Sequence, residues 1–520
     1  MLKPASVPQG GPCAGRRYGM QARSFEKTAS SRRGRFSLTQ PEVNFYFTDH
    51  EAHEEVVEME DRLVKRITLF VVTLAAFLTP FDGSAVNVAL PSIGKEFSMD
   101  AVSLGWVATA YLLASAMFLV PFGRVADIYG RKKIFTVGIL IFTAASFSMV
   151  LCRSGAMLIC LRIVQGFGSA MIFGTGVALL TSVFPAQERG KALGINVAAV
   201  YLGLSVGPFL GGLLTSHFGW RSIFWVNVPL GLLAMALVSF KLREEWAEAK
   251  GEKFDLSGSI IYCFGLVAII YGFSSFSRWG AEVGAGLILL GVLGILAFIG
   301  WETKVKNPVL NIDVFRGNRA FVLSNLAAFI HYSATFAVAF FLSLYLQYIK
   351  KLNPQSAGTI LVFQPVVMVV CSPFAGRLSD RIEPRIVASM GMALTAVGLF
   401  LLAFLQGNTS LEFVIADLIL LGLGFALFSS PNTNAVMSSV EKRFYGVASG
   451  TLGTMRLTGQ MLSMGMAMLI FAVHIGHAQI TPEYFPLLLK STRSAFILFG
   501  ILCSGGALAS LARGKVHLEH

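Results

Sequence analysis

Charged residues are scarce in this 520-residue chain, making up 14% of it against 54% hydrophobic residues. A water-soluble domain rarely has so little charge, because its surface must be polar. The shortage therefore excludes an ordinary soluble protein and favours a polytopic membrane protein. Acids are scarcer still, and the formal net charge of +13 indicates Lys and Arg that face the cytoplasm and anionic lipid, not nucleic acid.

The chain has only six cysteines and no Cys-x-x-Cys pair. Their positions imply neither a disulfide framework nor a zinc site, so we interpret them as small apolar packing residues. A Gly-x-x-x-x-Gly-Lys-Ser/Thr loop and a catalytic constellation are also missing, which disfavours an ATP-driven pump and an enzyme. His474-x-x-His477 resembles half a metal site but has no carboxylate or cysteine in register. We therefore predict no metal and no cofactor.

The start of the chain differs in composition from everything that follows. Its first part is rich in Arg and Lys, Asp49–Asp61 is acidic, and neither part has a sustained apolar period. This pattern predicts a disordered cytoplasmic tail over 1–64. The Arg- and Ser-rich beginning also resembles a transit peptide, and an over-long start, with Met20 or Met59 as alternatives, explains it equally well.

From Lys65 onward the sequence contains fourteen apolar runs, each about the length that spans a bilayer as a helix. They are roughly 67–90, 103–122, 134–151, 156–182, 193–216, 222–240, 257–277, 283–301, 320–345, 357–375, 386–406, 412–430, 446–473 and 494–512. The connections on the side of Gly123–Lys133 carry more than twice as many Lys and Arg as the opposite ones. This predicts an all-α, multi-pass protein of the cell membrane with 14 transmembrane helices and both termini cytoplasmic.

A short motif recurs in the second half of the chain. Gly123-Arg-x-x-Asp127 returns as Gly376-Arg377-x-x-Asp380 in an equivalent connection. The repeat predicts two six-helix halves and a two-helix insert, as in one large class of secondary transporters whose site lies near the bilayer midplane. The expected divisions are a tail at 1–64, a first half at 65–243, an insert at 244–305, a second half at 306–513 and a short tail at 514–520.

Four charged residues fall clearly inside the apolar runs: Asp82, Arg162, Asp417 and Arg456. Charge in hydrocarbon is costly and usually marks an ion or substrate pathway. At 1.5 Å per residue, Asp82 and Arg162 lie at similar depth in the outer half of the bilayer. A carboxylate there would exchange its proton for a cationic compound or for Arg162. The alternative is a static buried pair that fixes helix packing.

The other polar groups in the spans each permit two interpretations. Asp417 is either a second proton or cation site or an interfacial acid. Arg456 would bind a carboxylate or a helix carbonyl, which favours a structural role. A lone His in a bundle is more often a packing residue than a proton carrier. The candidate proton-coupling and substrate residues are Asp82, Arg162, Asp417, Asn87, His331 and Tyr332.

Several motifs together resemble the major facilitator superfamily, specifically its fourteen-span drug:proton antiporter branch, over about 65–512. Gly123–Lys133 is similar to the family's loop 2–3 motif, although Ile128 stands where a basic residue is common. The other motifs are Leu158-x-x-x-Arg162-x-x-Gln165-Gly166-x-Gly168, Gly203-x-x-x-Gly207-Pro208-x-x-Gly211-Gly212, Trp220-Arg221-x-x-Phe224-x-x-Asn227-Val-Pro229 and Asp82-x-x-x-x-Asn87-Val-Ala-Leu-Pro91. The resemblance implies a secondary active transporter that exports lipophilic, often cationic compounds in exchange for protons by alternating access.

Two of these motifs have a mechanical interpretation. Asp127 and Arg131 would bond neighbouring helix ends and hold one arrangement of the halves as a latch, unless the loop is only topogenic. The glycines of the fifth run and Pro208 predict a hinge or, alternatively, ordinary small-residue packing. The latch candidates are Gly123, Asp127, Gly130, Arg131, Arg377 and Asp380, and the hinge candidates are Gly203, Gly207, Pro208, Gly211 and Gly212.

The expected partners are a small lipophilic, cationic molecule, protons and the lipid bilayer, with the protein a monomer. One alternative is a dedicated exporter of a single endogenous metabolite or antibiotic, which the same motifs fit. Another is a non-transporting membrane sensor, against which the complete antiporter motif and Asp82 argue.

Overall fold

The computed structural model describes residues 45–185, 188–242, 245–310, 315, 317–441 and 445–514. Residues 1–44 of the tail expected at 1–64, and 515–520 of the short tail expected at 514–520, lie outside the described residues. Throughout the described ranges the regular elements are helices. They are α1 (Phe45–Phe97), α2 (Ala101–Tyr129), α3 (Arg131–Val150), α4 (Gly155–Val183), α5 (Arg189–Phe218), α6 (Arg221–Lys241), α7 (Leu256–Trp279), α8 (Ala281–Glu302), α9 (Arg319–Leu344), η2 (Tyr345–Ile349), α10 (Pro354–Leu361), α11 (Phe363–Arg381), α12 (Pro384–Leu402), α13 (Leu411–Ser438), α14 (Tyr445–His474), η4 (Pro482–Tyr484) and α15 (Phe485–Leu511). In the described part, 14 helical spans are long and apolar enough to cross a membrane, which confirms the predicted all-α membrane fold.

The first helix begins earlier than the sequence pattern indicated. α1 starts at Phe45, inside the range 1–64 that we expected to be a disordered tail. Residues 45–79 contain neither Pro nor Gly and include many Glu, Ala and Leu residues, so the helix extends beyond the apolar run. Its membrane-length apolar part is Arg62–Phe97.

Short polar side chains and a glycine set the helix ends that position the site. Asp100 caps α2 and Ser154 caps α4, each accepting a hydrogen bond from a backbone N–H three residues further on. Gly130 directly follows α2, its φ of 117° favours glycine, and a Cβ there would lie 2.6 Å from Glu245. The chain therefore turns sharply between α2 and α3.

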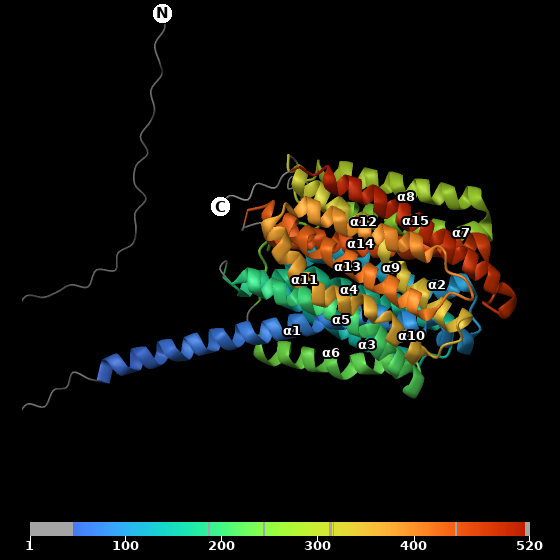
Figure 1. Ribbon diagram of the computed structural model, residues 1–520. Helices are drawn as coiled ribbons and strands as arrows, with labels where there is room; N and C mark the ends of the chain where they lie inside the picture. Colours follow the sequence, from blue (N-terminus) through green and yellow to red (C-terminus); the bar gives the residue numbers. More distant parts are fainter. Residues whose placement is uncertain are drawn as a thin grey trace, which may run out of the picture. The chain divides into compact units, whose positions relative to one another are not determined.

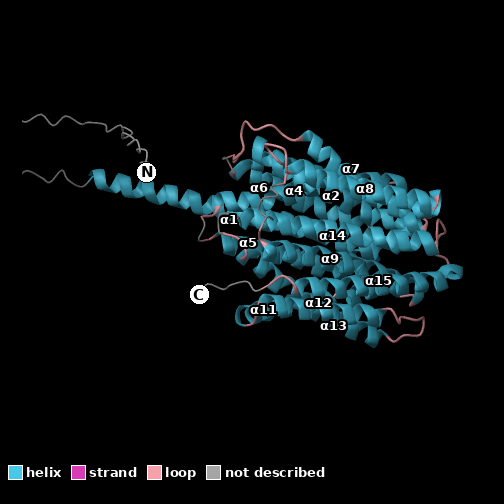
Figure 2. Ribbon diagram, turned by 90° about the horizontal axis from the view of Figure 1, so that it is seen from above, coloured by secondary structure: helices cyan, strands magenta, loops and turns pink. Residues whose placement is uncertain are grey.

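The two halves of the chain repeat one packing pattern. In the first half α3 packs against α4 and α6, and in the second half α12 packs against α13 and α15. The helices α7 and α8 lie side by side along one edge of the bundle (Figure 1 and Figure 2), and α7 contacts α2 and α14. This is the packing expected of two six-helix repeats with a two-helix insert.

We call the end of the bundle that carries Gly123–Lys133 the basic end. At the opposite end, hydrogen bonds join the two halves: Gln479 Nε2 donates to the Ser98 carbonyl at 2.9 Å. Closer to the middle of the bundle, Ser343 Oγ of the second half donates to the Asn87 carbonyl of the first half at 2.8 Å. The bundle is therefore closed at the end opposite the basic end.

Candidate functional site

A cavity of about 490 Å³ lies between the two halves. Thr79, Tyr111 and Gln460 line its inner end, and Asp127 and Glu248 line its mouth at the basic end. The stretch of α2 from Tyr111 to Asp127 spans about 24 Å at the helical rise of 1.5 Å per residue. The cavity is therefore deep, open at the basic end and closed at the other.

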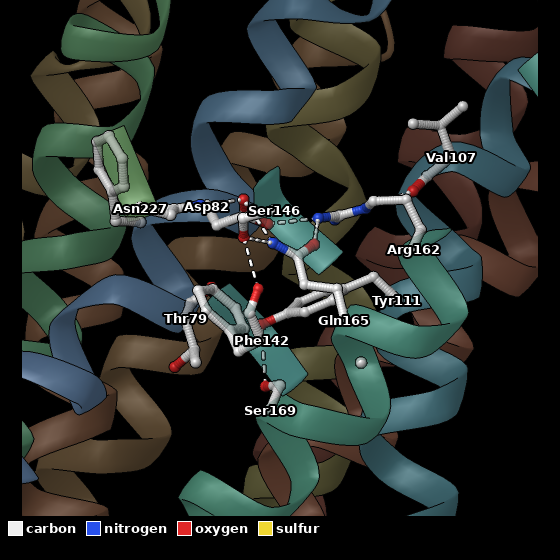
Figure 3. Close-up of polar contacts among 12 residues, drawn as sticks. Thr79, Asp82, Val107, Tyr111, Phe142, Ser146, Arg162, Gln165, Ser169 and Asn227 are labelled. Carbon is white, nitrogen blue, oxygen red and sulfur yellow. Dashed lines mark hydrogen bonds and ion pairs between the residues drawn. The ribbon is translucent and has the colours of Figure 1, made fainter. Parts of the chain in front are cut away.

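Beyond the inner end of the cavity, Asp82 of α1 and Arg162 of α4 form an ion pair whose side chains are both fully buried (Figure 3). Asp82 also accepts hydrogen bonds from Gln165 Nε2 at 3.1 Å and from Asn227 Nδ2 at 2.8 Å. The Asp82 carboxylate thus accepts hydrogen bonds from three side chains. The structure thus brings together two of the residues that the sequence singled out and adds two amides from α4 and α6.

Tyr111 separates this ion pair from the cavity. The guanidinium carbon of Arg162 lies 4.2 Å from the centre of the Tyr111 ring, a cation–π distance. The Tyr111 hydroxyl donates to the Thr79 carbonyl at 3.1 Å and lies 2.9 Å from Ser169 Oγ. Because Tyr111 also lines the cavity, it touches the cavity and Arg162 at once. Asp82 and Arg162 themselves lie behind the wall.

The other candidate residues lie apart from this pair. The ring of buried His331 packs on Phe428, with centroids 4.0 Å apart, and Asp417 is buried on the face of α13 toward α12. Asn87 is buried in α1, and its side-chain oxygen has no hydrogen-bond partner among the described residues. Tyr332 lies beside Arg456 and not beside the Asp82–Arg162 pair. None of the four lines the cavity in the described part of the chain.

The first group of latch candidates binds the segment that follows α6. Arg131 Nε donates to Asp127 at 2.8 Å, and its two terminal nitrogens donate to Glu248 at 2.7 and 2.9 Å. The backbone N–H of Ala249 donates to the Asp127 carbonyl at 2.9 Å, and that of Arg131 donates to the Trp246 carbonyl at 2.9 Å. Apart from Asp127, these partners lie in the connection between α6 and α7, at the start of the expected insert, and Gly123 lines the cavity mouth. The latch role stays a prediction.

The second copy of the motif lies at the end of α11. Arg377 is exposed there, and the side chain of Asp380 lies outside the described residues. No hydrogen bond joins Arg377 to another described residue. Arg377 corresponds to Arg124, which bonds Glu252 in the first half, and Pro384 stands where Arg131 would map. Among the described residues, this copy therefore shows no counterpart of the bond that Arg124 makes.

The glycines of the hinge motif pack α5 against two other helices. Gly203, Gly207 and Gly211 face α1, and a Cβ on Gly203 would lie 2.4 Å from a backbone oxygen of that helix. Gly212 faces α10, where a Cβ would lie 2.4 Å from a backbone oxygen, and the Pro208 carbonyl also touches α10. The motif thus brings α5 close to α1 in the first half and to α10 in the second half. Hinge motion stays a prediction.

A second polar cluster lies beside the cavity and includes Arg456, to which the sequence pattern gave a structural role. Arg456 lines the cavity, and its Nη2 donates to the Tyr201 hydroxyl at 3.3 Å. The same hydroxyl lies 3.2 Å from that of Tyr332 and bonds Ser429 Oγ. Tyr201 belongs to α5 and the other three to the second half, so this cluster links the halves.

Arg513, just beyond the last span, is another buried charge that the sequence pattern did not indicate. Its Nη1 donates to Asn432 Oδ1 at 2.9 Å and to Ser324 Oγ at 3.2 Å. Burial lowers the pKa of Arg513 to about 10, which leaves the guanidinium charged at neutral pH. It therefore ties α9 and α13 together at the basic end.

Membrane-length helices in two similarly packed halves, with a deep cavity between them that opens at one end, define a membrane transporter. The sequence profile of the Major Facilitator Superfamily matches residues 72–309 and 325–517. The chain belongs to this superfamily, and the resemblance drawn from its motifs is confirmed.

Similar proteins are themselves transporters or resistance proteins by name. The Riboflavin transporter RibZ of Clostridioides difficile is 30% identical over 437 residues, which are 84% of this chain and 92% of that protein. The Multidrug resistance protein Stp of Mycobacterium tuberculosis is 31% identical over 77% of this chain and 74% of its own length. The Puromycin resistance protein pur8 of Streptomyces alboniger is 34% identical over 76% of this chain and 80% of its own length.

A solved structure has the same fold. It is a bacterial homologue of the human lysosomal transporter Spinster in an inward-facing, unoccupied conformation. The TM-score is 0.61 at 15% identity, and the match covers 86% of this chain and 97% of that one. At this identity the likeness concerns the fold alone.

Proposed function

We propose that this protein exports lipophilic small molecules across the cell membrane in exchange for protons, as a monomer that alternates between two openings. One observation carries the proposal: the cavity reaches the basic end and stops at Tyr111, directly in front of the buried Asp82–Arg162 pair. The excess of Lys and Arg in the connections supports a cytoplasmic basic end and cytoplasmic termini. The cavity described here would then receive cargo from the cytoplasm.

The names of similar proteins support export. Two of those described above are resistance proteins, and a further relative, 28% identical over 79% of this chain, is the Tetracenomycin C resistance and export protein of Streptomyces glaucescens. Resistance by transport requires outward movement of the compound. We therefore assign the same direction to this chain.

In the buried pair, protonation of the Asp82 carboxylate and its ion pair with the Arg162 guanidinium exclude each other. With the outer end closed, Asp82 pairs with Arg162. When the outer end opens, water reaches Asp82, and a proton added to its carboxylate cancels the charge that holds Arg162. Return to the closed state restores the ion pair, and the proton leaves toward the cytoplasm. The electrical part of the driving force is about 2.3 kcal/mol per charge per 100 mV.

Tyr111 is the residue through which this change reaches the cargo. Its ring contacts Arg162, and its hydroxyl bonds Thr79 on α1 and Ser169 on α4. Any shift of Arg162 on protonation of Asp82 therefore moves a side chain of the cavity wall. This contact couples the proton site to the cargo site without requiring Asp82 to touch cargo.

The test is transport by the purified full chain in proteoliposomes under an imposed pH gradient. The panel comprises puromycin, riboflavin, a lipophilic cation and a lipophilic acid. We expect accumulation of at least one compound that stops when an ionophore collapses the gradient. Transport that is unaffected by the collapse would contradict proton coupling, and no transport of any compound would favour a sensor.

A dedicated transporter of one metabolite is the second candidate, and the similarity to a riboflavin transporter favours it. The two functions share the same helices and the same proton site. They differ in breadth: a dedicated transporter moves one member of the panel, whereas a multidrug exporter moves several unrelated ones.

A further inference from the structure

The described residues that line the cavity carry a net positive charge. Its charged residues are the basic Arg124, Arg131, Arg189 and Arg456 and the acidic Asp127 and Glu248. Both acids lie at the mouth, and both are already bound to Arg131. Among the described lining residues, the inner part of the cavity therefore holds a single charge, that of Arg456.

Two tyrosines contact Arg456 on the side away from the cavity, and one nitrogen of its guanidinium group has no hydrogen-bond partner among the described residues. Its guanidinium carbon lies 5.2 Å from the Tyr201 ring centre and 5.3 Å from that of Tyr332, and neither ring lines the cavity. One of its nitrogens donates to Tyr201, while its Nε is buried without a partner and no acid in the described part of the chain pairs with it. A guanidinium has five N–H donors in a planar fork that matches a carboxylate.

The surroundings of Arg456 suit the rest of an aromatic acid. Gln460 lies one helical turn further along the same face of α14 and also lines the cavity, so its amide is a neighbouring polar contact. Phe173 and Phe336 line the same cavity and provide flat apolar surface. The inner wall thus combines one cationic fork, an amide and aromatic rings.

We infer that the inner cavity binds the anionic group of an aromatic carboxylate through Arg456, so that the preferred cargo is an amphipathic acid and not a lipophilic cation. A cation would meet an uncompensated positive charge, since Asp82 is fully buried behind Tyr111 and lies outside the cavity. The inference rests on the proposed function only in treating this cavity as the cargo site. It replaces the cationic cargo that the family resemblance suggested.

The experiment compares three probes that share one ring system: naphthoate, naphthylmethanol and naphthylmethylammonium. Binding to the purified full chain is measured in detergent at pH 7 by calorimetry, without any proton gradient. We expect naphthoate to bind at least tenfold more tightly than naphthylmethylammonium, with naphthylmethanol between them. Equal or tighter binding of the ammonium probe, or no binding of naphthoate, would overturn the inference.

Variants assign the preference to one residue. Arg456→Gln should abolish the difference between the acid and the ammonium probe while naphthylmethanol binds within about threefold of the original, and Arg456→Lys should keep part of the preference. The matched control is Arg221→Gln, because Arg221 lies at the opposite end and outside the cavity. An unchanged preference in Arg456→Gln would contradict the role of Arg456. Proton coupling is measured separately, so it stands or fails by itself.

Discussion

Asp82 and Arg162 form a fully buried ion pair in which the acid also accepts hydrogen bonds from the side chains of Gln165 and Asn227. Arg162 in turn donates from Nε to the Val107 carbonyl at 3.0 Å. The pair therefore joins α1, α2, α4 and α6 at one point. Two charges placed so far from water stabilise each other, and removal of either leaves the other buried without its partner.

Removal of one partner should be costly for stability. Arg162→Met leaves the Asp82 carboxylate buried and unpaired, and we expect a loss of about 3–5 kcal/mol in the free energy of unfolding. The double variant Asp82→Leu with Arg162→Met should recover most of that loss, since it removes both charges. Reversible unfolding in mixed detergent measures each value. As a control, Arg221→Met breaks the half-exposed pair with Glu96 and should cost about 1 kcal/mol or less.

Asp417 should respond in the opposite direction. Both of its carboxylate oxygens are buried without a hydrogen-bond partner among the described residues. Asp417→Leu should therefore raise the free energy of unfolding by about 1–3 kcal/mol. If Asp417 is a second proton site, as the sequence pattern suggested, the same variant also loses gradient-driven transport. A stabilised variant with full transport would exclude that role.

Tyr111 offers two substitutions that separate its hydroxyl from its ring. Tyr111→Phe keeps the stacking on Arg162 and removes the hydrogen bond to Thr79, whereas Tyr111→Leu removes both. We expect Tyr111→Phe to retain most transport and Tyr111→Leu to lose at least tenfold, because only the latter breaks the contact between the cavity and the ion pair. The measurement is initial transport rate under a fixed pH gradient. Equal rates for the two variants would argue against Tyr111 as the link.

The hinge motif can be tested with two glycines of the same helix. A Cβ at Gly203 would lie 2.4 Å from the Phe77 carbonyl oxygen, whereas a Cβ at Gly194 would meet nothing within 4 Å. Gly203→Ala should push α5 away from α1 and lower both stability and transport. Gly194→Ala should be neutral or stabilising by up to about 1 kcal/mol, since alanine favours the helix. Normal stability and transport of Gly203→Ala would show that this packing is not required.

The fold was predictable because its main signal is local. The number of spans can be counted from apolar runs long enough to cross a bilayer, and the charge bias in the connections supports the count. Helix ends were harder: Lys490 and Arg493 lie in α15, which begins near Phe485, yet their charge placed them outside the apolar run that began at 494. Likewise, α1 already includes Phe45, and residues 45–79 contain no Pro or Gly that would interrupt it.

The candidate site was predictable only in part. Asp82 and Arg162 stood out because charge is so rare in the spans. Gln165 and Asn227 are also polar residues in apolar runs, but a sequence does not show that α4 and α6 turn them toward Asp82. The same limit applies to Arg456, whose position on the cavity wall depends on how α14 packs against the first half. Pairings between distant helices require the fold.

Proton movement through Asp82 is the central claim, and it can be measured directly. A pH-sensitive dye inside proteoliposomes reports proton flux when a transported cargo is added, for the unaltered chain, for Asp82→Asn and for the control Glu96→Gln, whose acid is partly exposed at the opposite end. We predict cargo-dependent proton flux in the unaltered chain and in Glu96→Gln, and at least a tenfold smaller flux in Asp82→Asn. Cargo-dependent proton flux of normal size in Asp82→Asn would contradict the account.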